Sequence, residues 1–429
     1  MAKIRSNRFI LMFISITLVY LLNVARANAA DQETLDRLEK IIKQQQAQIE
    51  AQQKTLEQLQ GELDVLKGQI PKTADKTDKP IKEAPATVRT GNPNANLKLY
   101  GQVNKAVLFS DDGDDSNLYL VDNDNHSTRV GLLGSIKPND HFELGTLIEV
   151  EYQTNPSNLV NQNDKRKGDA DFEKRHLDLW VNTNRFGKLS LGWGSAASDS
   201  ASEIDLSGTS VVGFSSIAEM AGGQLFYNND TDSLSTTAIR NAFTNWDGLG
   251  RDERIRYDTP SFKGFMGSTS YITDGGGDVA LRYNARIATF KLAAGAAYAD
   301  PGSTSDTIDD HLAGSLSLLH DSGFNGTFAM GSRNHKESGR DNGSFYYTKF
   351  GYRANWCPLG VTSLSLDYGR FSDVGVDGDD ADVIGLQMVQ DLQDWGSEVY
   401  LGYRFHKLDR NGEDYNDINA LMTGMRVKF

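Results

Sequence analysis

Short runs of alternating apolar and polar residues recur along the chain from residue 96 to residue 429. Successive side chains of a strand point to opposite faces, so each run predicts a β-strand with one apolar and one polar face. The polar faces are rich in charge, and Arg254, Arg256 and Arg282 are examples. A soluble sheet packs one face into an apolar core, whereas a transmembrane barrel turns one face to lipid and the other to a wet lumen. We therefore predict an all-β fold, a transmembrane antiparallel β-barrel of about 16 strands over residues 96–429.

The amino terminus has the pattern of a secretory signal peptide. Basic residues precede an apolar run, Phe9–Leu22, and small residues up to Ala29 follow it. The run is shorter than the roughly 20 apolar residues that a membrane-spanning helix needs, so we predict a cleaved signal peptide over residues 1–29 and not an anchor. The whole chain has a formal net charge of −14. Losing this basic segment makes it more acidic, which argues against nucleic acid as a partner.

A heptad repeat extends over residues 30–70. Apolar residues return at every seventh position from Leu35, and a second series, interrupted by two glutamines, starts at Leu38. This spacing predicts an α-helical coiled coil in the periplasm, and a single amphipathic helix is the alternative. The predicted seam is Leu35, Leu38, Ile42, Gln45, Ile49, Gln52, Leu56, Leu59, Leu63, Leu66 and Ile70. Residues 71–95 contain four of the nine prolines, among lysines and acids, and this composition predicts an exposed linker.

A long stretch rich in Ser, Gly and acidic residues, near residues 195–225, interrupts the strands. Loops of this length without structure of their own are usually functional or disordered. In a barrel such a loop can fold into the lumen and narrow it, so we predict a constriction between its acids and basic residues on the inward-facing strands. The acids are Asp199, Glu203, Asp205 and Glu219. The basic wall is Lys98, Arg129, Arg254, Arg256 and Arg282. Ordinary solvated loop charge is the alternative for each acid.

Several stretches resemble the trimeric general porins of Gram-negative outer membranes. They are Leu99–Gly101, Ser127–Leu132, Phe186–Gly192, the terminal Phe429 and, most specific of all, Arg256–Phe265. The resemblance covers residues 97–429 and implies three barrels per assembly, each with its own aqueous pore. It also implies that Arg129 points into the pore and that Phe429 is read by the assembly machinery of the outer membrane. If the barrel is trimeric, a three-stranded coiled coil is the consistent choice, because one axis serves both parts.

Two features depart from the family pattern. The acidic-aromatic motif of the third loop in enterobacterial members is absent, and the best-known members have no coiled coil. In addition, Arg175 matches an arginine of the family by its sequence context but has the lipid-facing parity of its strand. A bulge or a position at the rim would reconcile the two observations.

We expect an outer-membrane porin, a channel for passive diffusion of small hydrophilic solutes and ions, and not an enzyme. We expect no cofactor and no metal, because the seven histidines have no metal-ligand spacing and Asp111–Asp115 lacks a full calcium-loop pattern. The expected partners are further copies in a homotrimer, outer-membrane lipid and lipopolysaccharide, and the solutes. Two alternatives stay open: a solute-specific channel, and a structural protein that tethers the outer membrane to the cell wall through the coiled coil.

Overall fold

The computed structural model describes Lys43, Asn92, residues 94–166 and residues 172–429. The predicted signal peptide, the coiled-coil seam and most of the linker lie outside these residues. None of the helices in the described part of the chain is long and apolar enough to cross a bilayer.

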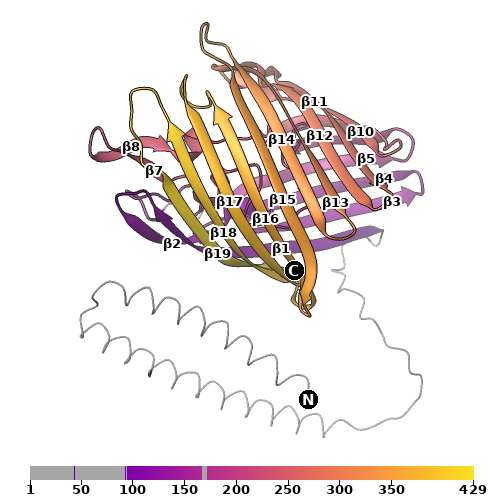
Figure 1. Ribbon diagram of the computed structural model, residues 1–429. Helices are drawn as coiled ribbons and strands as arrows, with labels where there is room; N and C mark the ends of the chain where they lie inside the picture. Colours follow the sequence, from indigo (N-terminus) through magenta and orange to yellow (C-terminus); the bar gives the residue numbers. More distant parts are fainter. Residues whose placement is uncertain (1–42, 44–91, 93, 167–171) are drawn as a thin grey trace. The chain divides into compact units, whose positions relative to one another are not determined.

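The main sheet of the described residues is antiparallel and closes on itself (Figure 1). Along one edge, β1 (Ala95–Asp111) pairs with β19 (Ile418–Lys428). Along its other edge, β1 pairs first with β3 (Arg129–Asn139) and then with β2 (Ser116–Asp122). Because β2 and β3 share one place beside β1, the 17 strands of this sheet make a 16-strand barrel. The predicted all-β antiparallel barrel is confirmed.

The other barrel strands follow in chain order, each antiparallel to the next. They are β4 (Phe142–Tyr152), β5 (Phe172–Thr183), β6 (Gly187–Ser195), β9 (Arg251–Asp258), β10 (Phe265–Ile272), β11 (Gly277–Ile287), β12 (Phe290–Asp300), β13 (Ile308–His320), β14 (Phe324–His335), β15 (Gly343–Cys357), β16 (Gly360–Ser372), β17 (Asp380–Leu392) and β18 (Ser397–Asp409). Short 3-10 helices lie in the connections at η1 (Asp124–His126), η2 (Thr273–Gly275), η3 (Gly302–Thr304) and η4 (Gln393–Trp395).

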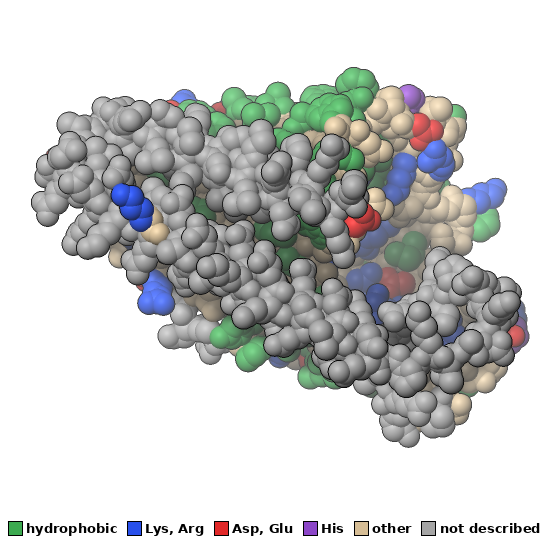
Figure 2. Space-filling model, turned by 90° about the horizontal axis from the view of Figure 1, so that it is seen from below, with side chains coloured by type: hydrophobic (Ala, Val, Ile, Leu, Met, Phe, Trp, Pro, Cys, Tyr) green, Lys and Arg blue, Asp and Glu red, His purple; other side chains and the backbone are tan. Residues whose placement is uncertain are grey.

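The two faces of the sheet differ in the way that the alternation predicts. In β1, Leu99 (52% exposed) and Val103 (45% exposed) point outward, whereas Gln102 and Asn104 are buried on the inner face. Within the described part, Figure 2 shows acidic and basic side chains beside one another in a hollow, with apolar side chains along the outside. An apolar outer face suits hydrocarbon, and a polar inner face suits water.

Exposed aromatic side chains form a belt near each end of the barrel. At the end with the short turns they are Phe142, Phe186, Phe262, Phe265, Phe290, Phe324, Trp356, Trp395 and Phe429. Near the end with the long connections they are Phe109, Tyr152, Phe172, Tyr271, Tyr298, Tyr346, Tyr368 and Tyr403. Two belts match the two interfaces of a bilayer.

The connection between β6 and β9, residues 196–250, is the longest in the described part of the chain, and we call it the inner loop. It contains α3 (Ala218–Ala221), β7 (Leu225–Asn228), β8 (Ser233–Ala238) and α4 (Ile239–Ala242). β7 and β8 form a separate two-stranded sheet, so β6 pairs directly with β9 in the barrel wall.

An apolar core lies between the inner loop and the inner face of the barrel. Phe243 and Trp246 of the loop pack against Phe371 (β16) and Phe345 (β15), with ring centroids 5.2 Å and 5.5 Å apart. All four side chains are buried. Aromatic pairs at such distances add about 0.5–1.5 kcal/mol each beyond the area that they bury. The strand pattern predicts a polar inner face throughout; it is apolar here because the loop supplies matching apolar residues.

Candidate functional site

The first part of the inner loop runs along the inner wall of the barrel and is fixed by polar side chains of successive strands. The Ser198 amide donates to Asp278 Oδ2 of β11 over 2.7 Å, and the Ile204 amide donates to Ser315 Oγ of β13 over 2.9 Å. Both strand residues are buried. Backbone amides that would otherwise be orphaned inside the barrel therefore have partners, which holds residues 196–217 against the wall.

Two fully buried cations anchor the same loop on the far strands. Lys349 Nζ of β15 lies 2.6 Å from Asp205 Oδ2 and donates to the Gly213 carbonyl over 2.5 Å. Arg404 of β18 donates to the Phe214 carbonyl over 2.7 Å. A buried cation without such acceptors would be costly, so these side chains require the loop to stay in place.

Acidic side chains of the inner loop gather in one cluster, formed by Asp199, Glu203 and Asp247. Ser200 bridges them, because its amide donates to Asp247 Oδ1 over 2.5 Å and its hydroxyl donates to Glu203 Oε2 over 3.3 Å. Asn245 Nδ2 donates to Glu203 Oε1 over 2.9 Å. Burial raises the pKa of Glu203 to about 7, and the charge of Asp199 adds to the effect. Among the described residues no ion pair neutralises this cluster.

Glu219 belongs to a second acidic site on the inner loop. It lies beside Asp124 of η1, and Asn158 Nδ2 contacts both carboxylates. The Ser216 hydroxyl donates to Glu219 Oε1 over 3.0 Å. Burial, together with the hydrogen bond to Asp124 and the charge of Asp124, raises the pKa of Glu219 well above its usual value. When two carboxyl groups are this close, the charge of one disfavours ionisation of the other, which therefore keeps its proton to a higher pH.

Arginines of β9 and β11 lie next to the start of the inner loop. Arg254 Nη2 is 2.5 Å from Asp178 Oδ2, and Arg256 Nη2 is 2.8 Å from Asp258 Oδ1. Arg282 donates to the Asp199 carbonyl over 2.7 Å. The negative charges of Asp199 and Asp247 act on Arg282, and the positive charge of Arg251 acts on Glu203. The structure thus brings Arg282 of the predicted wall to the predicted loop acid Asp199, whereas Arg254 and Arg256 pair with carboxylates of the barrel strands.

Arg129 and Arg175 extend the basic wall onto β3 and β5. Arg129 Nη1 lies 3.9 Å from Glu149 Oε1, and Arg175 Nε lies 2.8 Å from the same atom. Arg175 also pairs with Glu151. It is the extra residue of a β-bulge, because Glu149 pairs with His176 and Val150 pairs with Lys174. The bulge turns Arg175 inward against the parity of its strand, as the first of the two suggested explanations requires.

Two residues of the predicted site lie elsewhere. Asp205 faces Lys349 and none of the predicted arginines. Lys98 is exposed near the short-turn end of β1 and makes no ion pair within the described part of the chain. Asp247 and Lys349 were not predicted. The inward parity of Lys349 in its strand could have identified it as a residue of the lumen. Asp247 lies beyond residues 195–225, the stretch predicted to form the constriction.

A cavity of about 170 Å³ lies between the inner loop at Ser210 and the wall. Its basic lining residues are Arg353, Arg426 and Lys428, and its acidic ones are Asp391 and Glu398. Arg426 and Lys428 both pair with Glu398. Charges of both signs therefore line the lumen on this side of the loop as well.

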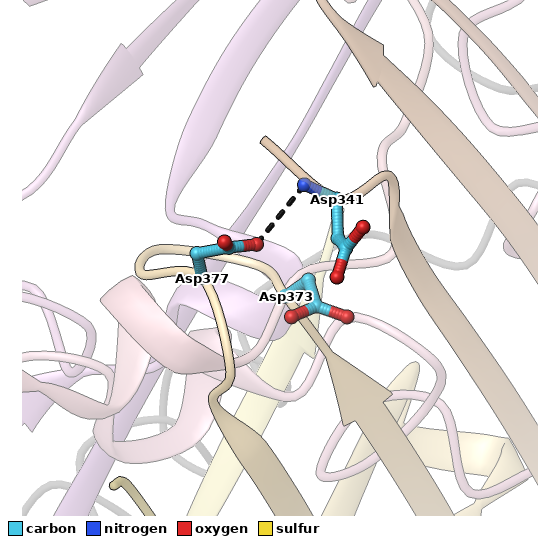
Figure 3. A group of neighbouring side chains, drawn as sticks. All are labelled: Asp341, Asp373 and Asp377. Carbon is cyan, nitrogen blue, oxygen red and sulfur yellow. Dashed lines mark hydrogen bonds between the residues drawn. The ribbon is translucent and has the colours of Figure 1, made fainter. Parts of the chain in front are cut away.

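Three carboxylates from two outer loops, Asp341, Asp373 and Asp377, lie within reach of a single ion (Figure 3). The Asp341 amide donates to Asp377 Oδ1 over 3.0 Å, which orders the two loops without a metal. Asp341 and Asp377 are exposed. Exposed acidic groups of this kind are common in proteins, and we assign no metal to this one.

The fold and the charged lumen define an outer-membrane channel, and the comparison with protein families agrees. The model for the Gram-negative porin family matches residues 84–411. The chain therefore belongs to the Gram-negative porin family. It is an outer-membrane porin channel and not an enzyme, so both predictions are confirmed. A comparison with curated protein sequences finds no match.

Solved structures share the barrel fold. The anion-selective porin from Comamonas acidovorans is 17% identical with a TM-score of 0.53, and the match covers 78% of this chain and 100% of that chain. OmpT of Vibrio cholerae is 14% identical with a TM-score of 0.51, covering 80% and 100% of the two chains. The outer membrane channel DcaP of Acinetobacter baumannii is 11% identical with a TM-score of 0.50, covering 80% and 100%. At these identities the likeness concerns the fold alone.

Proposed function

We propose that the water-filled lumen of this porin lets small hydrophilic solutes and ions diffuse passively and that residues 196–217 of the inner loop form its constriction. The observation that carries the proposal is the cluster of Asp199, Glu203 and Asp247 beside Arg282. Opposed charges at a narrow wet gap orient dipolar solutes and disfavour apolar ones. The channel needs no moving part and no covalent chemistry for this task.

Reversal of one wall charge tests the proposal. The partner of Arg129 among the described residues is distant, with 3.9 Å between Nη1 and Glu149 Oε1. Arg129→Glu should move the zero-current potential in a KCl gradient toward cation preference, because a positive charge in the lumen becomes negative. Arg185→Glu, in the exposed turn between β5 and β6, is the matched control and should change little. An unchanged potential in Arg129→Glu would remove this residue from the pore wall.

We also propose that the protein is a homotrimer surrounded by lipid and lipopolysaccharide. Support comes from the outer face of β2, where Leu118 and Leu120 are 64% and 73% exposed. Lys105 is on the same outer face, half exposed, with Nζ 2.5 Å from Asp122 Oδ1. An outward lysine is costly in hydrocarbon, so contact with a second subunit explains this face better than lipid does.

The periplasmic coiled coil over residues 30–70, its attachment to the cell wall and selectivity for a single solute stay predictions. No observation on the described residues favours a tether or a solute-specific channel over general diffusion.

A further inference from the structure

The inner wall at the long-loop end of the barrel carries a cluster of positive and N–H-donating side chains. Arg333 of β14 lies with its guanidinium 5.2 Å from the ring centroid of Trp246, on the inner loop. Gly343 is the register partner of Arg333 on β15, and a Cβ there would lie 2.8 Å from the Trp246 ring. Trp246 therefore occupies the space that the glycine leaves, directly beside the guanidinium.

Two further side chains, an imidazole and a guanidinium, complete the cluster. His311 is the register partner of Arg333 on β13, so their side chains are neighbours on the inner face. Arg340, in the loop after β14, is close enough for its positive charge to act on Arg333 and on His335. Four strand or loop segments thus bring their donors together at the outer entrance of the lumen.

Several nitrogen atoms of this cluster have no acceptor among the described residues. Trp246 is 1% exposed, and its Nε1 has no hydrogen-bond partner. The Nε atoms of Arg333 and Arg340 are equally buried and equally without a partner. Within the described part of the chain neither arginine belongs to an ion pair. Arg340 donates only to the carbonyls of Val374 and Gly375. Buried donor atoms left in this state are uncommon, because the cost of their desolvation is not offset.

The nearby carboxylates are committed to other groups. Asp278 accepts from the amide and hydroxyl of Ser198. Asp310 accepts from Asn334 Nδ2 over 2.9 Å. In the acidic group on the outer loops, Asp377 accepts from the Asp341 amide and Asp373 accepts from the Gly378 amide. None of the carboxylates near the cluster in the described part of the chain therefore serves as its partner.

We propose that this cluster binds the carboxylate or phosphate group of an anionic solute before the solute reaches the constriction. A guanidinium presents a planar fork of donors that matches the oxygens of such groups, and an indole N–H adds one more donor. Two arginines exclude cationic solutes, and a neutral sugar offers no charge to balance them. The proposal rests on the channel function proposed above, since the solute enters through the open lumen.

Current block by inorganic phosphate tests the site. Phosphate is added to a reconstituted channel in KCl, on the side that the long loops face, and interruptions of the current are counted. Wild type should show saturable block. Arg333→Gln should raise the half-blocking concentration about tenfold, which is the loss expected for a hydrogen bond to a charged group. Arg370→Gln, on the outer face at the same end of β16, should leave it unchanged because Arg370 pairs with Asp380 and Asp382 outside the lumen.

A second variant keeps the test decisive if Arg333→Gln does not fold. Trp246→Phe keeps the ring against Phe345 but removes the indole N–H, and it should also weaken the block. Acetate should reproduce the block through its carboxylate, and methylammonium should not. A wild-type channel that conducts without saturable block, or equal block in Arg333→Gln and Arg370→Gln, overturns this inference alone. A wild-type protein that does not conduct overturns the proposed function as well.

Discussion

Glu203 combines two properties that a pore residue needs to respond to pH. It lies on the inner loop and not on a membrane-spanning strand, and it shares a cluster with Asp199 and Asp247. Burial, with the charge of Asp199 adding to it, raises the pKa of Glu203 to about 7. A carboxyl group with a raised pKa is neutral below that value and charged above it, so the cluster loses negative charge as the pH falls.

Cation preference should therefore decrease as the pH falls through 7. Most of the change in zero-current potential in a KCl gradient should lie within about one pH unit of 7, the range in which a single group titrates. Glu203→Gln has no proton to exchange and should abolish this step, whereas Glu143→Gln, at the short-turn end of β4, should retain it. A step of equal size in Glu203→Gln would assign the titration to another group.

For single residues, the alternating pattern predicts the face of most charged side chains but not of all of them. Alternation places Arg129, Arg254, Arg256 and Arg282 on the inner face, and the structure has them there. Alternation alone predicts Arg175 on the outer face, whereas the structure has it on the inner face. One extra residue at a β-bulge reverses the parity, and the alternating pattern contains no signal for the bulge. Which cation meets which acid was not predictable, since the path of a loop through the lumen depends on contacts far apart in sequence.

The inner loop is an element that the barrel holds by buried charge. Lys349 and Asp205 are both nearly inaccessible to solvent, and the lysine also donates to the Gly213 carbonyl. Removing one member of a buried pair leaves the other uncompensated, at a cost of about 3–5 kcal/mol. Removing both members together can be close to neutral. Comparing a single variant with the double variant therefore separates the effect of the ion pair from the effect of the changed side-chain volume.

Lys349→Met should release this part of the loop from the wall. We expect larger and noisier single-channel conductance, because the constriction is no longer fixed. The double variant Lys349→Met with Asp205→Asn should recover much of the wild-type behaviour, since no bare charge remains. Lys137→Met, an exposed lysine 4.0 Å from Glu143, is the control. Conductance in Lys349→Met equal to that of the control would mean that the apolar core alone holds the loop.

The strands were predictable as elements because each one repeats the same two-residue period between lipid and water. The apolar core inside the barrel was not predictable from that period. Phe345 and Phe371 have inward parity, and only the position of Phe243 and Trp246 on a distant loop explains why they are apolar. A local pattern gives the face of a side chain but not the chemistry of what covers that face.

The whole molecule shows an interruption in its outer surface at β2. This strand pairs with β1 along one edge only, and no other described strand covers its second edge. The Asn155 side chain donates to the Leu120 carbonyl over 2.7 Å, which satisfies part of that edge. An open edge beside exposed leucines is unsuited to lipid, because hydrocarbon offers no hydrogen bonds. It is suited to contact with another protein surface.

A polar substitution on this face should therefore change the number of subunits. Wild type in detergent should sediment with the mass of three chains, and Leu120→Gln should shift toward one chain, because the amide disrupts a packed contact. Leu386→Gln on β17 is the matched control, with 58% of the leucine exposed on the same kind of outer face. If the outer face of β17 contacts lipid, the Leu386→Gln variant should still have the mass of three chains. Equal masses for the two variants would place the subunit contact elsewhere on the barrel, and a monomeric wild type would exclude the trimer.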